Sequence, residues 1–291
     1  LERAPKEESF YDPNESKYIA FPFGLSERPQ VDLSVIIPAY NESVRLPIMI
    51  GDALDYLSTR ESRGNFTYEV IIIDDGSTDG TSQVALKYSQ KFTTDVFRVL
   101  TLHKNRGKGA AVRIGMLSAR GRILLFADAD GATKFSDVEK LEKKLSSLTA
   151  SRWNGSNAVI CGSRAHLESD VLAKRHPFRN LLMYCFHFAV WILCVKGIRD
   201  TQCGFKLFSR SAARVIFHNQ HVERWAFDVD VLYLANYFGI SIAEVPVSWH
   251  EVDGSKLVPV LSWLQMAKDL LSIRLRYALG AWKIEPGHRI D

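Results

Sequence analysis

The sequence lacks the features that mark several large classes of protein. Its four cysteines (Cys161, Cys185, Cys194 and Cys203) form no CxxC pair, so we expect reduced thiols rather than a zinc site or a disulfide framework. No apolar run reaches the roughly 20 residues that a membrane-spanning helix needs. The net charge of +4 is too small for the basic stripe of a nucleic-acid-binding protein, although it suits an anionic membrane face. Nucleic acid is therefore not an expected partner.

What the sequence does have is enough apolar material for one large domain. Hydrophobic residues make up 46% and charged residues 24% of the 291 residues, which is typical of a globular chain. Residues 1–30 are polar, contain four prolines and show no apolar period, which predicts an extended arm rather than a folded unit. We expect the catalytic domain to cover residues 31–291. The chain starts with leucine rather than methionine, so a membrane anchor upstream stays an open possibility.

From residue 31 onward, short apolar runs alternate with amphipathic stretches. Strands are expected at residues 33–38, 69–74, 97–102 and 122–127, and helices at 45–59, 78–92, 107–119 and 136–148. Residues 70–73 and 123–126 are apolar on both faces, as buried parallel strands are. The pattern predicts a Rossmann-like α/β fold with a mostly parallel central sheet and helices on both faces.

Polar clusters follow three of these strands: Pro-Ala-Tyr-Asn-Glu at 38–42, Asp-Asp-Gly-Ser-Thr-Asp-Gly at 74–80, and Asp-Ala-Asp-Gly at 128–131. Ligands of such sheets bind beyond the carboxyl ends of the strands. We therefore expect the three clusters to meet in one cleft.

Asp128 and Asp130 stand two residues apart directly after an apolar strand. Two carboxylates at a strand end can share one hard cation, Mg²⁺ or Mn²⁺, which completes its coordination with water and phosphate oxygens. Such an ion stabilises the charge that grows on a departing diphosphate. The alternative is a solvated turn that caps the next helix.

The other two polar loops suit a nucleotide. Asp74 or Asp75 can accept a hydrogen bond from the N–H of a base, and Gly76 permits close approach; the same loop could instead cap the following helix. The basic loop at 103–109, His-Lys-Asn-Arg-Gly-Lys-Gly, opens a helix and suits an anion, although it lacks the spacing of a Walker loop and could be solvated.

These motifs, in this order, resemble glycosyltransferase family 2, whose members have the GT-A nucleotide-diphospho-sugar transferase fold. The resemblance covers residues 33–282. The second half of the chain narrows it to the polyprenyl-phosphate glycosyltransferases, and within them to the dolichyl-phosphate β-glucosyltransferases, through ICGSR (160–164), DTQCGFKLF (200–208), RWAFDVD (224–230) and GSKL (254–257).

The motifs and the resemblance together imply a set of site residues. A metal would be held by Asp128 and Asp130, although Ala132 stands where related mannosyl enzymes often have glutamine, so the coordination must be completed otherwise. Arg164 and Lys256 would hold phosphate, and Gln202 and Asp228 would face the sugar. The predicted nucleotide-sugar site comprises Pro38, Tyr40, Glu42, Asp74, Asp75, Gly107, Lys108, Asp128, Ala129 and Asp130.

The acceptor side is predicted to meet a membrane. Residues 181–195 carry no charge and contain four aromatic side chains, which favours an interfacial helix at about 174–198, with a buried core helix as the alternative. A second amphipathic helix is expected at about 259–282. Basic residues at these segments would bind the membrane and the acceptor phosphate: Lys174, Arg175, Arg179 and Lys256.

The resemblance implies inverting transfer of glucose from UDP-glucose to dolichyl phosphate at the cytosolic face of the endoplasmic reticulum. A phosphate acceptor is already anionic, so no general base is required, and Asp228 would orient the sugar or stabilise positive charge, with a base as the lesser option. The alternatives are transfer of mannose from GDP-mannose and a non-catalytic nucleotide-sugar-binding membrane protein. A processive polysaccharide synthase is disfavoured because it needs a multi-helix pore. The oligomeric state is left open.

Overall fold

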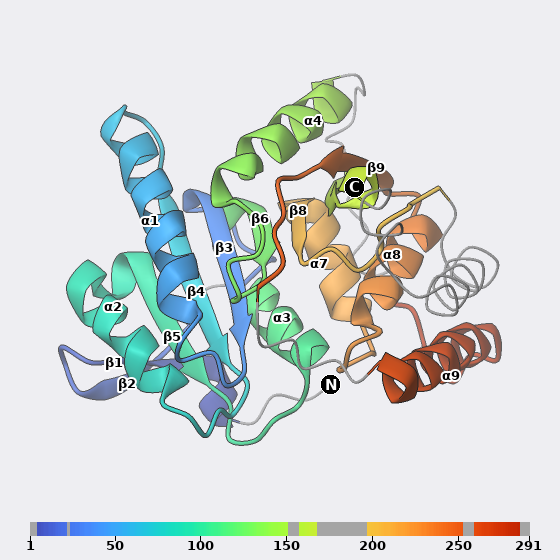
Figure 1. Ribbon diagram of the computed structural model, residues 1–291, viewed down its shortest axis with the longest axis horizontal. Helices are drawn as coiled ribbons and strands as arrows, with labels where there is room; N and C mark the ends of the chain where they lie inside the picture. Colours follow the sequence, from blue (N-terminus) through green and yellow to red (C-terminus); the bar gives the residue numbers. More distant parts are fainter. Residues whose placement is uncertain (1–4, 22–23, 151–156, 168–196, 253–258, 286–291) are drawn as a thin grey trace.

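The computed structural model describes residues 5–21, 24–150, 157–167, 197–252 and 259–285. A seven-stranded sheet with the strand order β5-β4-β3-β6-β8-β7-β9 runs through the molecule (Figure 1). Its strands are β3 (Val31–Ala39), β4 (Tyr68–Asp74), β5 (Phe97–Thr101), β6 (Gly121–Ala127), β7 (Ala158–Ser163), β8 (Phe205–Ser209) and β9 (Ser241–Pro246). The helices are α1 (Leu46–Ser62), α2 (Thr81–Val96), α3 (Lys108–Leu117), α4 (Val138–Ala150), α7 (Arg210–Asn219), α8 (Phe227–Tyr237) and α9 (Pro259–Ala278), with short 3₁₀ turns at Pro5–Glu8, Phe135–Asp137 and Ala165–Leu167.

The sheet has a parallel half and a mixed half. Strands β5, β4, β3 and β6 are all parallel. Strand β8 runs antiparallel to both of its neighbours, β6 and β7, and β9 is parallel to β7. The prediction of a mostly parallel α/β sheet is therefore confirmed. The antiparallel strand β8, from the second half of the chain, pairs with β6, the strand that leads into the Asp-Ala-Asp motif.

Helices cover both faces of the sheet, as predicted (Figure 1). Residues of the inner strands alternate between two apolar layers: Ile36 and Ile71 pack with α3, α7 and α8, whereas Val35 and Val70 pack with α1 and α4. This period of two, with both faces apolar, explains why the strands read as continuous hydrophobic runs. Burial on both sides fixes the register of the strands and thus the positions of the loops at their carboxyl ends.

The segment before Val31 differs from the extended arm that the sequence predicted. Its strands β1 (Ser9–Asp12) and β2 (Lys17–Ala20) form an antiparallel hairpin. Phe10 and Leu25 are buried, and the Arg98 guanidinium lies 5.3 Å from the centre of the Phe10 ring. Glu7 also forms an ion pair with Arg106, so apolar burial and a charged contact together hold this segment on the domain.

The predicted membrane-facing segments are only partly described. The helix expected at about 174–198, with Lys174, Arg175 and Arg179, and the residue Lys256 lie outside the described residues. The helix expected at 259–282 is α9, which ends four residues earlier at Ala278. Within the described ranges, none of the helices combines the length and the hydropathy required to span a bilayer.

Cys161 and Cys203 are buried free thiols, and burial raises the pKa of each to about 12.

Candidate active site

The two aspartates at the end of β4 organise the loops around them. Asp74 is buried and accepts hydrogen bonds from the Ser77 amide (2.9 Å) and the Ser82 hydroxyl. Asp75 accepts from the main-chain N–H of Arg106 (2.7 Å) and of Gly107 (2.8 Å). Burial raises the pKa of Asp75, while the two main-chain hydrogen bonds oppose the rise. Asp75 therefore ties the basic loop to the end of β4, and because a carboxylate has about four acceptor positions it can still receive a further donor.

Glycines let the basic loop lie close to its neighbours. Gly107 has a φ of 105°, and a Cβ built on it would lie 2.7 Å from the Glu223 carbonyl oxygen. Gly76 has a φ of 70°, and its Cβ would lie 2.7 Å from the Lys104 carbonyl carbon. Any other residue at either position would be strained and would push the two loops apart. The basic loop is thus clamped between the end of β4 and the segment before α8.

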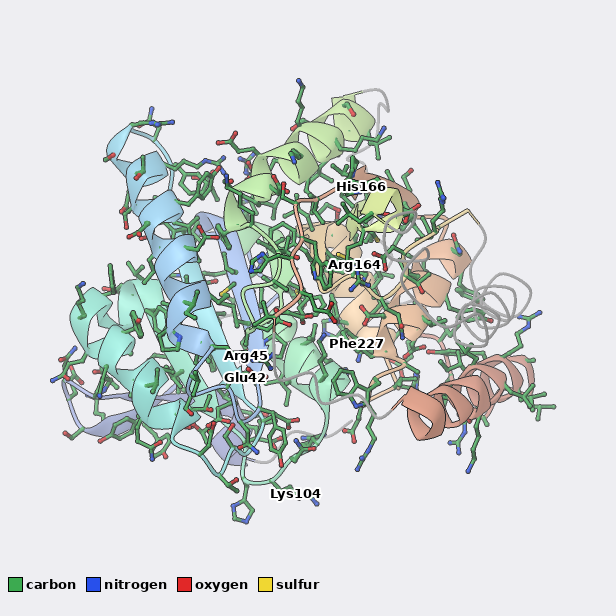
Figure 2. All side chains as sticks on the ribbon, viewed as in Figure 1. Glu42, Arg45, Lys104, Arg164, His166 and Phe227 are labelled. Atoms are coloured by element: carbon green, nitrogen blue, oxygen red, sulfur yellow. The ribbon has the colours of Figure 1, made fainter. Side chains whose placement is uncertain are left out.

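The loop after β3 supplies the third wall. Pro38 is buried in β3 opposite Ile73, whereas Tyr40 is 37% exposed at the end of the strand. Glu42 accepts two hydrogen bonds from Arg45, at 2.7 and 2.6 Å. In Figure 2, Glu42 and Arg45 lie at the base of α1, Lys104 lies at the tip of the basic loop, and Phe227 lies across from Glu42 at the start of α8.

The Asp-Ala-Asp motif after β6 meets the basic loop directly. Lys108 Nζ lies 2.6 Å from Asp128 Oδ1, so an ion pair joins the basic loop to the Asp-Ala-Asp motif. Ala129 is buried between the two aspartates. Burial raises the pKa of Asp130, and the charge of Asp128 raises it further. The hydrogen bond to Glu42 raises the pKa of Arg45, and the charges of Asp130 and Asp128 add to this.

Two close carboxylates suit a divalent cation better than two protons. The mutual repulsion of Asp128 and Asp130 is relieved when a cation binds both, and water and phosphate oxygens are the usual remaining ligands of Mg²⁺ and Mn²⁺. Across the described ranges, the His, Cys, Asp and Glu side chains do not gather in groups of three or more that could hold a metal. The two carboxylates fit a cation whose remaining ligands are water or phosphate oxygens.

Gly204 makes room for Asp128. The Asp128 amide donates to the Gly204 carbonyl oxygen at 2.9 Å. A Cβ built on Gly204 would lie 1.9 Å from Asp128 Oδ2, which no relaxed structure permits. The chain just before β8 is thus shaped to receive the carboxylate of the Asp-Ala-Asp motif.

Asp228 lies in the first turn of α8 and is 4% exposed. Its Oδ1 accepts from Lys206 Nζ at 2.6 Å, and the same ammonium donates to the Cys203 carbonyl oxygen at 2.6 Å. Burial raises the pKa of Asp228; Lys206 and Lys108 oppose the rise, and Asp128 adds to it. The carboxylate is therefore fixed by a buried ion pair and acts electrostatically on Asp128.

Arg164 follows β7 and is held by Asp200. The Arg164 Nε and Nη2 atoms donate to the Asp200 carboxylate at 2.7 and 2.9 Å, and the Arg164 amide donates to Asp200 Oδ2 at 2.9 Å. Burial raises the pKa of Asp200, but the hydrogen bond and charge of Arg164 outweigh it, so the pKa is below its ordinary value. The fork uses two of the five guanidinium N–H donors, which leaves donors for an anion. Gln202, two residues after Asp200 in the sequence, is half-buried.

Sequence reasoning missed the partners of the predicted residues: Asp200, Gly204 and Lys206. One signal was readable. Lys206 interrupts the apolar strand β8, whose first four residues are all buried, and a lysine in such a strand needs a buried anion.

A hollow of about 440 Å³, lined by Met49, Gly131, Trp249 and His250 among others, opens beside the Asp-Ala-Asp-Gly turn.

Comparison with known proteins agrees with this geometry. Residues 34–217 match the model of glycosyl transferase family 2. The chain belongs to this family. It is 60% identical to the human dolichyl-phosphate β-glucosyltransferase over 91% of this chain and 82% of that protein, and 48% identical to that of Saccharomyces cerevisiae over 87% and 77%.

The fold matches solved glycosyltransferases. Glucosyl-3-phosphoglycerate synthase of Mycobacterium tuberculosis, in complex with Mn²⁺, UDP and phosphoglyceric acid, superposes with a TM-score of 0.55 at 19% identity, over 86% of this chain and 79% of that one. The predicted family and the GT-A fold are thus confirmed, and the chain is a glycosyltransferase.

Proposed function

We propose that this chain transfers glucose from UDP-glucose to dolichyl phosphate and forms dolichyl β-D-glucosyl phosphate, the lipid-linked glucose donor of N-glycan precursor assembly. The observation that carries the proposal is the ion pair between Lys108 Nζ and Asp128 Oδ1, at 2.6 Å. It joins the basic loop to the carboxylate pair of the Asp-Ala-Asp motif. The choice of glucose and of dolichyl phosphate follows the relatives named above.

The donor would lie along the carboxyl ends of β3, β4 and β6. Tyr40 and Asp75 are proposed to contact the base, and Gly107 and Lys108 the diphosphate. Asp128 and Asp130 would hold Mg²⁺ or Mn²⁺, which as a Lewis acid stabilises the negative charge of the leaving UDP. Lys108, whose ammonium lies 2.6 Å from Asp128, would add a positive charge for the same phosphates.

The acceptor chemistry needs no proton transfer. A phosphate oxygen of the lipid attacks the anomeric carbon, its electron pair forms the new C–O bond, and the bond between that carbon and the UDP oxygen breaks, so UDP leaves with the electron pair. Attack opposite the leaving group converts an α-linked donor into a β-linked product. We assign Asp228 to orienting the sugar or stabilising the positive anomeric carbon, because Lys206 fixes its carboxylate.

Arg164 is proposed to neutralise phosphate while Asp200 holds it in place, and Gln202 to contact the sugar. Lys256 and the basic residues Lys174, Arg175 and Arg179 are proposed for the acceptor phosphate and the membrane surface from their sequence positions. Together these charges would offset the repulsion between the donor diphosphate and the acceptor phosphate.

The membrane side is proposed to include α9. Leu271, Leu275 and Leu279 are 50%, 47% and 80% exposed and follow one another at a spacing of four residues, which places them along one side of the helix. Lys268, Arg274 and Arg276 are exposed on the same helix. Exposed leucines beside basic residues are typical of a helix that lies in the headgroup region, which suits a site at the cytosolic face of the endoplasmic reticulum.

Product analysis tests the reaction. The chain is incubated with a short polyprenyl phosphate and either UDP-glucose or GDP-mannose, with Mg²⁺, Mn²⁺ or EDTA, and the sugar in the organic phase is measured. We expect glucose transfer that EDTA abolishes. Asp130→Asn should lower the rate at least about 100-fold, whereas Asp55→Asn on the exposed side of α1 should not change it. Preferred transfer of mannose, or full activity of Asp130→Asn, would overturn the donor or the metal assignment respectively.

Vesicle sedimentation tests the membrane face. The wild-type chain should sediment with vesicles of phosphatidylcholine and phosphatidylserine more than with phosphatidylcholine alone. Replacement of Leu271, Leu275 and Leu279 by serine should abolish this binding. Val44→Ser with Ile48→Ser, which changes the 80% and 68% exposed residues at the start of α1, should leave it unchanged; equal losses for both variants would contradict the assignment of α9.

A further inference from the structure

One buried carboxylate holds the C-terminal helix and the segment before α8 together. Asp230 is fully buried in α8, two residues after Asp228. Its Oδ1 accepts from the Tyr277 hydroxyl of α9 at 2.7 Å. Its Oδ2 accepts from the main-chain N–H of His221 (2.9 Å) and of Val222 (3.0 Å). Both oxygens are thus used, one toward each neighbour.

On the side of α9, aromatic rings reinforce this contact. Tyr277 stacks on Tyr233 of α8 with 4.8 Å between ring centres. His221 stacks on Trp282, just beyond α9, at 5.1 Å with an interplanar angle of 12°. Rings packed in this way restrict one another as well as the hydrogen bonds they surround. The C-terminal end of the helix proposed to face the membrane is therefore anchored to α8.

On the other side, residues 220–223 form the support of the basic loop. The Glu223 carbonyl oxygen accepts from the Ala110 amide at 2.9 Å. The Gln220 side-chain amide donates to the carbonyl oxygens of Gly109 (3.0 Å) and Val222 (2.8 Å). A Cβ on Gly109 would lie 2.5 Å from the Val222 oxygen, so the two backbones are in direct contact. A shift of this segment must move the first turn of α3, where Lys108 lies.

We propose that Asp230 and Tyr277 are positioning residues that couple α9 to the donor-binding loop. The route runs from α9 through Tyr277 and Asp230 to residues 221–223, and from there to Gly107 and Lys108 beside Asp128. A helix that docks on the membrane would then set the loop that holds the donor diphosphate. The identity of the donor rests on the proposed function, whereas the coupling itself depends only on contacts within this chain.

Two tyrosines of the same hollow give a matched pair of variants. Tyr277 and Tyr237 both line a hollow of about 410 Å³ between α8 and the segment after α9, but Tyr277 is 9% exposed and Tyr237 is 60% exposed. Tyr277→Phe removes only the hydroxyl that reaches Asp230, and Tyr237→Phe removes a hydroxyl at the surface. Leu57→Ala, a buried position of α1 in the core on the other face of the sheet, serves as a control for lowered stability.

The readout is UDP affinity in the presence of Mn²⁺ and the absence of lipid, measured by calorimetry, together with hydrogen exchange of the Ala110 amide. We expect Tyr277→Phe to weaken UDP binding roughly five- to tenfold and to accelerate exchange at Ala110, whereas Tyr237→Phe and Leu57→Ala change UDP binding less than about twofold. If Tyr277 only stabilised the fold, Tyr277→Phe and Leu57→Ala would weaken UDP binding to the same extent when they lower Tm by the same amount.

The coupling is wrong if Tyr277→Phe binds UDP within twofold of the wild type, or if Leu57→Ala weakens binding as much. A wild-type chain that binds GDP rather than UDP would contradict the proposed donor, and the same series with GDP would then decide the coupling. A wild-type chain that binds neither nucleotide would overturn both proposals.

Discussion

The two sides of the proposed active site hold their carboxylates in different ways. On the donor side, Asp74 and Asp75 accept from main-chain N–H groups and a hydroxyl of nearby loops. On the other side, Asp200 and Asp228 accept mainly from the charged side chains of Arg164 and Lys206, with the Arg164 amide as an additional main-chain donor to Asp200. A main-chain donor is present whatever the side chain is, whereas a charged partner is lost with one substitution. The second side should therefore be far more sensitive to single changes.

The largest expected effect is that of Lys206→Met. It leaves the Asp228 carboxylate buried and uncompensated, and we expect the free energy of unfolding to fall by about 3–5 kcal/mol. Asp74→Asn on the donor side should cost about 1 kcal/mol, since one neutral acceptor remains. Urea unfolding measures both. Adding Asp228→Asn to Lys206→Met should restore part of the loss, and equal costs for Lys206→Met and Asp74→Asn would remove the contrast.

The same contrast explains what the sequence could predict. The donor side is built from short local patterns, an apolar strand followed at once by its polar loop, so the four βα units and the polar loops at their strand ends could be expected from the chain alone. The charged pairs of the second side join residues separated by 36 positions (Arg164 and Asp200) and 22 positions (Lys206 and Asp228). No local period marks such partners.

The N-terminal hairpin and the position of Gly204 were beyond prediction for a related reason. Phe10 and Leu25 are buried because β5 and the helices beside it offer an apolar surface, and a polar segment does not show this. In the sequence, Gly204 does not differ from any other glycine before a strand. A glycine is required there only because the Asp128 carboxylate packs against it. Both features depend on which surfaces meet after folding.

Gly204→Ala should have the next largest effect, because it acts where the two sides touch. The added Cβ would displace the Asp128 carboxylate, and we expect glucosyl transfer to fall about 100-fold, equivalent to about 2.7 kcal/mol. The matched change is Gly51→Ala in α1, where a Cβ meets nothing within 4 Å; it should leave transfer unchanged and stabilise the chain by about 0.5–1 kcal/mol. If Gly204→Ala keeps normal transfer and normal UDP binding, the reaction does not depend on the position of the Asp128 carboxylate against Gly204.

Asp230 sharpens the comparison, because it lies on the same helix as Asp228 but accepts only from a tyrosine hydroxyl and main-chain N–H groups. Burial raises the pKa of Asp230 to about 6. A carboxyl whose pKa is raised on folding favours the folded state at low pH, and this contribution is lost as the pH rises through about 6.

Asp230→Asn mimics the protonated form, so its stability relative to the wild type should increase by about 2 kcal/mol between pH 4.5 and pH 7.5. Urea unfolding of both chains at the two pH values gives this difference. The same experiment with Asp55→Asn, an exposed carboxylate on α1, should show no such trend. A difference that stays constant with pH would mean that Asp230 keeps its ordinary pKa.

A smaller effect than those of Lys206→Met and Gly204→Ala is expected for Asp200→Asn, because the Arg164 side chain is 33% exposed and solvent screens the pair. Asparagine keeps one acceptor oxygen for the Arg164 amide or Nε but loses the charged fork. The guanidinium should then be held less firmly, and we expect kcat/KM for the lipid phosphate to fall about tenfold, equivalent to about 1.4 kcal/mol, with little change in the KM for UDP-glucose. Glu15→Gln, which breaks the exposed pair with Lys17, should change neither constant. A rise confined to the KM for UDP-glucose would instead place Arg164 on the donor phosphates and move the boundary between the two sides of the cleft.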